Sequence, residues 1–256
     1  MSKSVAIVTG ASQGIGRATA IRLARDFSAL VLIARNQVKL AQTAEAVSTA
    51  GAQALVIDAD LAQPQAAQAV VDQTLAAFGR IDALLNIAGA VPQIDLFEMT
   101  DAQWESGLAL KLHGARRLTV AAWPALRESK GSVVLMSGNS ALFPKAPYAA
   151  VGTINAAIVA LAKAFSDRGI TDGVQVNSVL PGPVMTGRRR SYLEHWAPLH
   201  NMTVEEATAS FPKEAGIARY GEPDEIAELM AFLVSPGAHW MTGSALRMDG
   251  GEVKSV

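Results

Sequence analysis

A glycine-rich segment near the start of the chain has the residue types needed to bind a phosphate group. Residues 9–16 read Thr-Gly-Ala-Ser-Gln-Gly-Ile-Gly and follow a short apolar run. Glycine permits a sharp turn and a close approach of the backbone to phosphate, and free N–H groups at the start of a following helix stabilise the negative charge. The glycine spacing differs from the common G-x-G-x-x-G pattern, and a tight turn alone would also use glycine. Because the segment opens a strand–helix–strand pattern, we favour a dinucleotide site contacted by Gly10, Ser12, Gln13, Gly14, Ile15 and Gly16.

The residue that ends the second apolar run bears on the choice of dinucleotide. In such a site it faces the adenosine ribose, where a carboxylate accepts a hydrogen bond from the 2′-hydroxyl of NAD and repels the 2′-phosphate of NADP. The chain has Ala34-Arg35 and no acid at this point, and a guanidinium can bind phosphate through two hydrogen bonds. We therefore predict that NADP(H) is preferred and that NAD(H) is possible. Gln13, which carries no charge, weakens this prediction, and the alternative is that Arg35 is a solvated turn residue.

Short apolar runs alternate with longer segments of helical period along the chain. Continuous apolar strands separated by helices are typical of a parallel sheet covered by helices on both faces. We predict an α/β fold with a single doubly wound parallel sheet of about seven strands. The strands that we can place cover residues 5–8, 30–33, 54–57, 83–87, 133–136 and 174–180. The helices that we can place cover residues 14–24, 38–50, 64–78, 101–127 and 147–167, the fourth starting at a capping box of Thr100 and Gln103.

The alternation of strands and helices is broken near residues 184–215. This segment holds Arg188-Arg189-Arg190, three aromatic residues and two histidines. A long insertion in a compact domain usually has a function, so we predict a helical lid, with two ordinary surface helices as the alternative. The arginines could attract an anionic substrate or form a solvated charge run. Because no long linker interrupts the chain, residues 1–256 are expected to form a single domain.

Composition excludes several classes of protein. Lys and Arg number 22 and Asp and Glu 23, so the net charge of −1 argues against binding nucleic acid or a membrane surface through bulk charge. The chain has no cysteine, which excludes disulfides and thiolate metal sites. The four histidines show no ligand spacing, so no metal is predicted. We see no signal peptide and no apolar run of membrane-spanning length, and expect a cytoplasmic protein.

Several motifs together resemble those of the short-chain dehydrogenase/reductase family. Besides the segment 9–16, the chain has Asp60-Leu61, the tetrapeptide Asn-Ile-Ala-Gly at 86–89, and Asn-Ser-Val-Leu-Pro-Gly at 177–182 followed by Thr186. Gly-Glu-Pro at 221–223, Thr-Gly at 242–243 and Asp-Gly-Gly at 249–251 match the family's C-terminal part. The resemblance implies a Rossmann-type fold, a nicotinamide cofactor and a homodimer or homotetramer. The further cofactor contacts that it implies are Asp60, Leu61, Asn86, Ala88, Gly89, Pro181, Gly182, Val184 and Thr186.

The resemblance weakens at the reaction centre. The family uses a Tyr as proton donor, a Lys four residues later, a Ser that polarises the substrate oxygen and an Asn on the preceding helix. Tyr148 is where the Tyr is expected, but the Lys position is Gly152, the Asn position is Lys111 and the Ser position is Gly138. The chain thus resembles a divergent branch of the family.

We hypothesise that the lysine has been relocated. A nearby cation lowers the pKa of a phenol, so Lys111 could serve Tyr148 from the neighbouring helix, and Gly152 would leave room for its side chain. The alternative is that Lys111 is a surface lysine and Gly152 a close-packing point. Ser137 and Ser140 are candidates for the missing hydroxyl, and Asn139 and Asn155 could also donate a hydrogen bond. The sequence does not choose among them.

These observations predict an enzyme that interconverts a carbonyl and a secondary alcohol by hydride transfer. NADP(H) would exchange the hydride with a small-molecule substrate, and Tyr148, assisted by Lys111, would exchange the proton. The competing hypothesis is a catalytically impaired dinucleotide-binding protein that acts as a cofactor sensor or partner subunit. A third is dehydration or isomerisation, because a fold does not fix its function.

Overall fold

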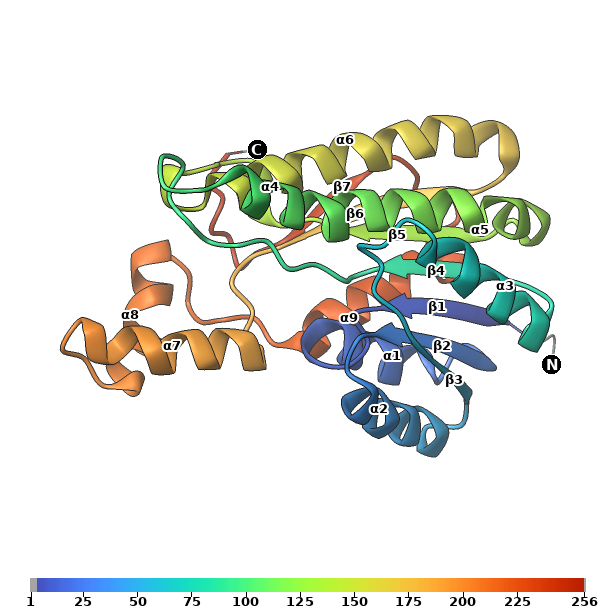
Figure 1. Cartoon of the computed structure of the whole chain (residues 1–256), viewed down its shortest axis with the longest axis horizontal. Coiled ribbons are helices and arrows are strands. Elements are labelled where there is room, and N and C mark those ends of the chain that lie inside the picture. Colours follow the sequence, from blue (N-terminus) through green and yellow to red (C-terminus); the bar gives the residue numbers. More distant parts are fainter. Residues whose placement is uncertain (1–3, 256) are drawn as a thin grey trace.

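The computed structural model describes residues 4–255, and its centre is one parallel sheet. Seven strands lie in the order β3-β2-β1-β4-β5-β6-β7 (Figure 1). The order reverses beside β1, which pairs with β2 on one side and β4 on the other. Ligands of open α/β sheets bind at such a reversal, at the carboxyl ends of the strands. The strands are β1 Val5–Thr9, β2 Ala29–Ala34, β3 Gln53–Asp58, β4 Ala83–Asn86, β5 Ser132–Met136, β6 Gln175–Pro181 and β7 Ala245–Met248.

Helices cover both faces of the sheet because the central strands are apolar on both sides. One face packs against α3, α5 and α6, and the other against α1, α2 and α9 (Figure 1). The long helices are α1 Gly14–Leu23, α2 Gln37–Thr49, α3 Ala66–Phe78, α5 Ala115–Ser129, α6 Ala149–Asp172 and α9 Pro223–Leu233. The remaining helical elements are α4 Asp101–Gly107, the π-helical turn η1 Leu108–Gly114, α7 Gly187–Leu199, α8 Val204–Ala215 and three short 3₁₀ turns, η2 Asn139–Ala141, η3 Ala146–Tyr148 and η4 Pro236–Ala238.

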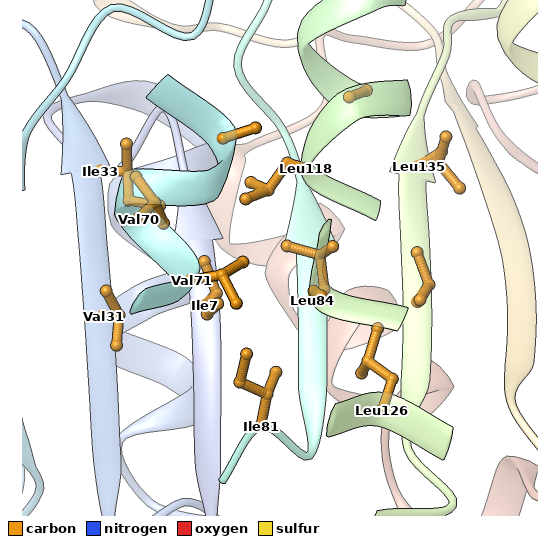
Figure 2. Close-up of a cluster of buried hydrophobic side chains, with 14 of the residues drawn as sticks. Ile7, Val31, Ile33, Val70, Val71, Ile81, Leu84, Leu118, Leu126 and Leu135 are labelled. Carbon is orange, nitrogen blue, oxygen red and sulfur yellow. The ribbon is translucent and has the colours of Figure 1, made fainter. Parts of the chain in front are cut away.

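The alternation of side chains along each strand divides the core into two layers. In Figure 2 the fully buried Ile7 and Leu84 point to the same face of the sheet, towards Val71 of α3 and Leu126 of α5. The neighbouring Val8 points to the opposite layer. Burying a side chain of this size stabilises the fold by about 1.5–3 kcal/mol, so the two layers hold the strand ends rigidly where the cleft forms.

Most of the elements predicted from the sequence are confirmed. The six predicted strands and five predicted helical segments are present, and Thr100 and Gln103 form the expected capping box. The predicted helix 101–127 is not uniform, because the turn η1 separates α4 from α5. The sequence analysis did not locate β7 or α9. β7 is largely exposed and lacks the apolar run that marked the other strands.

The segment 184–215 forms the two helices α7 and α8, which project from the body beyond the sheet (Figure 1). They enclose a small core of their own, formed by Leu193, Ala197, Ala207 and Tyr220. Thr203 caps α8 through a capping box with Glu206. The predicted helices of this segment are confirmed, and the lid and the alternative of two ordinary surface helices both stay predictions.

One helix is more apolar than the sequence analysis recognised. Residues 146–172, which comprise η3 and α6, have a window of mean hydropathy 1.5 and are long enough to cross a membrane by length and composition alone. The expectation that no segment has this character was therefore wrong. In the structure Ile154, Ile158 and Ala162 of this helix are buried, and α6 packs against β6 and β5. The apolar window of this helix is 39% buried.

The close packing of α1 on the first loop can be tested by Gly16→Ala. A Cβ at this position would lie 2.2 Å from the carbonyl oxygen of Gly10. We expect the free energy of unfolding in urea to fall by about 1–3 kcal/mol, because the loop must move. Gly187→Ala is the control, since a Cβ there meets no atom within 4 Å. Equal stability of the two variants would contradict the packing described here.

Candidate functional site

A cleft of about 1030 Å³ lies at the carboxyl ends of the strands, at the reversal of strand order. It is lined by the loop after β1, the ends of β2 and β5, the segments after β3, β4 and β6, the turn η1 and the start of α7. Of the residues predicted to contact a cofactor, all line this cleft except Asn86 and Pro181. Asn86 is instead buried, and its Nδ2 donates to Thr119 Oγ1 at 3.1 Å.

The loop after β1 has an open backbone cradle. Thr9 Oγ1 accepts hydrogen bonds from the backbone N–H groups of Ile87 and Ala88 at 2.8 and 2.9 Å, which ties β1 to the segment after β4. Gly10 has φ +68°, and a Cβ there would lie 3.1 Å from the Ala88 backbone. No side chain caps the first turn of α1, so its N–H groups are free to bind an anion. These features fit the pyrophosphate of a dinucleotide.

Two basic residues lie at the adenosine end of the cleft. Arg35, predicted from the sequence, lines it together with Lys39 of α2, which the sequence analysis missed. Lys39 Nζ donates to Gln13 Oε1 at 3.0 Å, so the uncharged Gln13 has a cation beside it. Lys39 lies four residues after Arg35 at the start of a helix, and this one-turn spacing was the signal that could have identified it.

Lys111 lies beside the cleft, next to the lining residue Gly89, and is held by two neutral oxygen atoms. It lies in the π-helical turn η1, and π-turns inside helices are frequent at functional sites. Its Nζ donates to the backbone oxygen of Ser137 at 3.2 Å and to Asn155 Oδ1. Its aliphatic chain passes over Gly89, where a Cβ would lie 3.1 Å from Lys111 Cδ. Lys111 is therefore no surface lysine, and Gly89 leaves the space that its side chain occupies.

The surroundings of Lys111 make its ammonium unusually ready to lose a proton. Burial and, to a smaller extent, the positive charge of Arg188 together lower the pKa of Lys111 to about 8. Arg188 reaches across from α7, and both of its terminal nitrogens donate to the backbone oxygen of Gly89 at 3.2 Å. A lysine with this pKa titrates near physiological pH, which is a property that functional sites share.

Gly152 does not make room for Lys111. A Cβ at Gly152 would lie 2.7 Å from Pro144 Cβ and 3.0 Å from the backbone oxygen of Ser140. The explanation that Gly152 accommodates the lysine chain is wrong, and the close-packing alternative is confirmed. The α6 residue that faces Lys111 is Asn155, three positions further along.

The candidate hydroxyl and amide donors form a network around Asn155. Ser137 Oγ donates to the Asn155 backbone oxygen at 2.7 Å, and Asn155 Nδ2 donates to Ser140 Oγ at 2.9 Å. Asn139 is turned away, because its Nδ2 donates to the Glu252 carboxylate. Ser137, Ser140 and Lys111 are not among the residues that line the cleft, but Gly89, Leu110 and Met136 beside them are.

Tyr148 ends the 3₁₀ turn η3 just before α6 and is half-buried. Asn155 follows it by seven residues, about 10 Å along the helix axis. Among the hydrogen bonds of residues 4–255, none joins Tyr148 to Lys111. Like Lys111, Tyr148 is not among the residues that line the cleft, and the contact between phenol and ammonium stays a prediction.

The α7–α8 pair places further cations and aromatic rings at the cleft. Arg188, Arg189 and Tyr192 line it, and the Arg189 guanidinium lies 5.4 Å from the Tyr192 ring and 5.9 Å from the Phe211 ring. The histidines of α7 bond to carbonyls of their own helix. Within residues 4–255, no group of three or more His, Asp or Glu side chains is placed to hold a metal ion.

The chain is similar to many reductases over nearly its full length. A family model described as enoyl-(acyl carrier protein) reductase matches residues 10–252. The short-chain reductase protein NovJ of Streptomyces niveus is 32% identical over 249 residues, which cover 97% of this chain and 94% of that protein. The 3-oxoacyl-[acyl-carrier-protein] reductase FabG of Staphylococcus aureus is 28% identical, with 98% of each chain covered.

Solved structures agree with this similarity. L-Sorbose reductase from Gluconobacter frateurii, in complex with NADPH and L-sorbose, superposes with a TM-score of 0.95 at 28% identity, covering 100% of this chain and 98% of that one. The fold, the nucleotide cleft and these relatives lead to one assignment. The chain belongs to the short-chain dehydrogenase/reductase family of NAD(P)-dependent oxidoreductases.

Proposed function

We propose that this protein is an NADP(H)-dependent oxidoreductase that interconverts a carbonyl and a secondary alcohol. The observation that carries the proposal is a nucleotide cleft lined by cationic side chains, with the half-buried ammonium of Lys111 beside the lining residue Gly89. Retention of a built polar centre around Lys111 favours an enzyme over a dinucleotide sensor.

The preference for NADP(H) is supported by charge. Arg35 and Lys39 lie together in the cleft, and both are suited to a 2′-phosphate. L-Sorbose reductase and an actinorhodin polyketide ketoreductase variant, both structural neighbours, are described as NADPH complexes. A third neighbour, xylitol dehydrogenase, is described as bound to NAD⁺, so NAD(H) remains a second cofactor in the proposal.

A nicotinamide bound in the cleft would supply or accept the hydride, and the residues of this chain stabilise the charge on the substrate oxygen. In carbonyl reduction that oxygen gains negative charge and needs a proton. We assign the proton transfer to the Tyr148 phenol. Lys111 supplies the positive charge that stabilises the oxyanion. Ser137 and Ser140 act through the amide network beside Lys111.

The substrate in this proposal is a small carbonyl compound or alcohol. The α7–α8 pair acts as a lid, with Arg188 and Tyr192 at the cleft to meet the substrate. We propose a homodimer or homotetramer that works in the cytoplasm, and we propose neither nucleic acid nor membrane as a partner.

Cofactor preference can be tested with Arg35→Ala. Loss of a charge-assisted contact to the 2′-phosphate costs about 1.5–3 kcal/mol, which corresponds to roughly 10- to 100-fold weaker NADPH binding. The Kd for NADH should stay within a few-fold, as titrations of cofactor fluorescence would show. Arg25→Ala, at an exposed position after α1, is the control. Wild-type protein that binds NADH as tightly as NADPH would defeat the prediction.

Turnover can be tested by following NADPH consumption with a panel of ketones, aldehydes and β-keto esters. We expect the wild type to reduce at least one class, and Lys111→Met to lower kcat by about 10²–10³-fold, the usual cost of one oxyanion-stabilising group. Cofactor affinity should change only a few-fold. Lys163→Met, an exposed lysine of α6, is the matched control. Full activity of Lys111→Met would remove the lysine from the reaction, and an inactive wild type would favour a cofactor sensor.

The proton donor is tested by Tyr148→Phe, which removes only the phenolic oxygen. We expect kcat to fall by about 10²–10⁴-fold with the Kd for NADPH unchanged, as for the loss of a general acid. The fall should be as large for single-turnover reduction as for steady state. If turnover stays within a few-fold of the wild type, the proton comes from another group.

A further inference from the structure

We propose that Asn155 is the positioning residue for Lys111, and that Gly138 exists to admit its amide. This inference rests on the proposed function, since it concerns the cation assigned there to the reaction centre. It explains why the side chain that faces the ammonium is an amide and why the residue before Asn139 has no side chain.

The amide of Asn155 is fixed at every polar atom. Its side chain is 3% exposed, its Oδ1 accepts from Lys111 Nζ, and its Nδ2 donates to Ser140 Oγ at 2.9 Å. Its backbone oxygen accepts from Ser137 Oγ at 2.7 Å. An ammonium has donors only, so a flipped amide would set its NH₂ group against another donor. Lys111 and Asn155 therefore fix each other's orientation.

Gly138 gives the amide its space. A Cβ at residue 138 would lie 2.6 Å from Asn155 Nδ2. The backbone there is extended, with φ 173° and ψ 154°, a conformation that any residue adopts. Backbone freedom is thus no reason for glycine at this position, and the approach of the Asn155 amide is one.

Lysine and asparagine have changed places relative to the family pattern described above. That pattern has the amide on the helix before β5 and the ammonium on the helix after it. Here the ammonium comes from η1 and the amide from α6, and the two still meet. The exchange keeps one cation and one amide at the centre while both backbone elements stay in place.

The pair leaves the ammonium poised to act on a substrate or phenol oxygen. Of its three N–H groups, two are used by Ser137 O and Asn155 Oδ1 within residues 4–255, so the third is available. Both acceptors are neutral, and the charged group that faces Lys111, Arg188 from α7, repels it. Asn155 thus orients the ammonium without the counter-charge that would raise its pKa far above neutral pH.

The experiment titrates Lys111 directly, by NMR of protein labelled with ¹³Cε-lysine, in the wild type and in Asn155→Asp and Asn155→Leu. We expect a wild-type midpoint near the pKa of about 8, with the signal identified by its loss in Lys111→Met. Asn155→Asp places a carboxylate beside the ammonium and should raise the midpoint by about 1–3 pH units. Asn155→Leu removes the acceptor and should lower it.

Activity gives the second readout. If turnover needs the ammonium form, kcat for reduction falls as pH rises past the Lys111 midpoint. In Asn155→Asp the pH at which kcat falls should then be higher than in the wild type, by the same number of pH units as the midpoint. Asn155→Leu should reduce kcat at least tenfold with the Kd for NADPH unchanged. Gly138→Ala, which leaves Asn155 itself intact, should shift the midpoint in the same direction as Asn155→Leu, and it serves if Asn155→Leu does not fold.

The outcomes separate this inference from the proposed function. If the Lys111 midpoint shifts as expected in these variants but the wild type reduces no carbonyl, the positioning role is supported and the proposed reductase function is wrong. An unchanged Lys111 midpoint in Asn155→Asp and Gly138→Ala, in an enzyme that reduces carbonyls normally, would overturn the positioning role alone. A loss of thermal stability without any change in the midpoint would show that Asn155 has a structural role only, and would also overturn it.

Discussion

The structure of the site depends on one ammonium group, that of Lys111, which is buried among neutral oxygen atoms. Removing a lysine from water is costly, so the group must keep hydrogen-bond acceptors or lose its proton. Here the acceptors are Ser137 O and Asn155 Oδ1, and no carboxylate contacts Lys111 within residues 4–255. The result is a cation whose pKa is lowered to about 8, not a salt bridge.

Three backbone features make this arrangement possible. The turn η1 carries Lys111 beside the cleft, Gly89 leaves space for its aliphatic chain, and Gly138 leaves space for the Asn155 amide. Each belongs to a different element, and the buried sheet holds these elements in register. The same sheet holds the first loop, where Thr9 binds the segment after β4. Nucleotide cleft and ammonium are therefore positioned by one rigid frame.

Sequence patterns predicted the parts of the molecule that depend on local chemistry. The apolar strands, the Thr100 capping box and the glycine loop follow from residue types at fixed spacings, and they occur where expected. β7 was not located, because its exposed residues give no buried pattern. Asn86 looked like a cofactor contact by motif, but it bonds to Thr119 inside the core.

The reaction centre was predicted only in part, because its geometry depends on packing between distant segments. Lys111 was identified from its unusual place in a family motif. Asn155 was named only as a possible hydrogen-bond donor, and its contact with Lys111 was not predicted, because nothing local marks it as the α6 residue that meets a side chain from η1. The reason for Gly152 also lies outside α6, in the loop that brings Pro144 against it. Contacts of this kind are set by tertiary structure, and a single sequence does not encode them as a pattern.

A crystal structure of the protein with NADPH bound tests the central claim most directly. The account predicts that the nicotinamide lies beside Gly89. It also predicts that the Lys111 ammonium stays bonded to Asn155 and faces both C4 of the nicotinamide and the Tyr148 phenol. A Lys111 side chain turned towards bulk solvent, with its ammonium distant from both, would contradict the account and leave a protein that binds the nucleotide only.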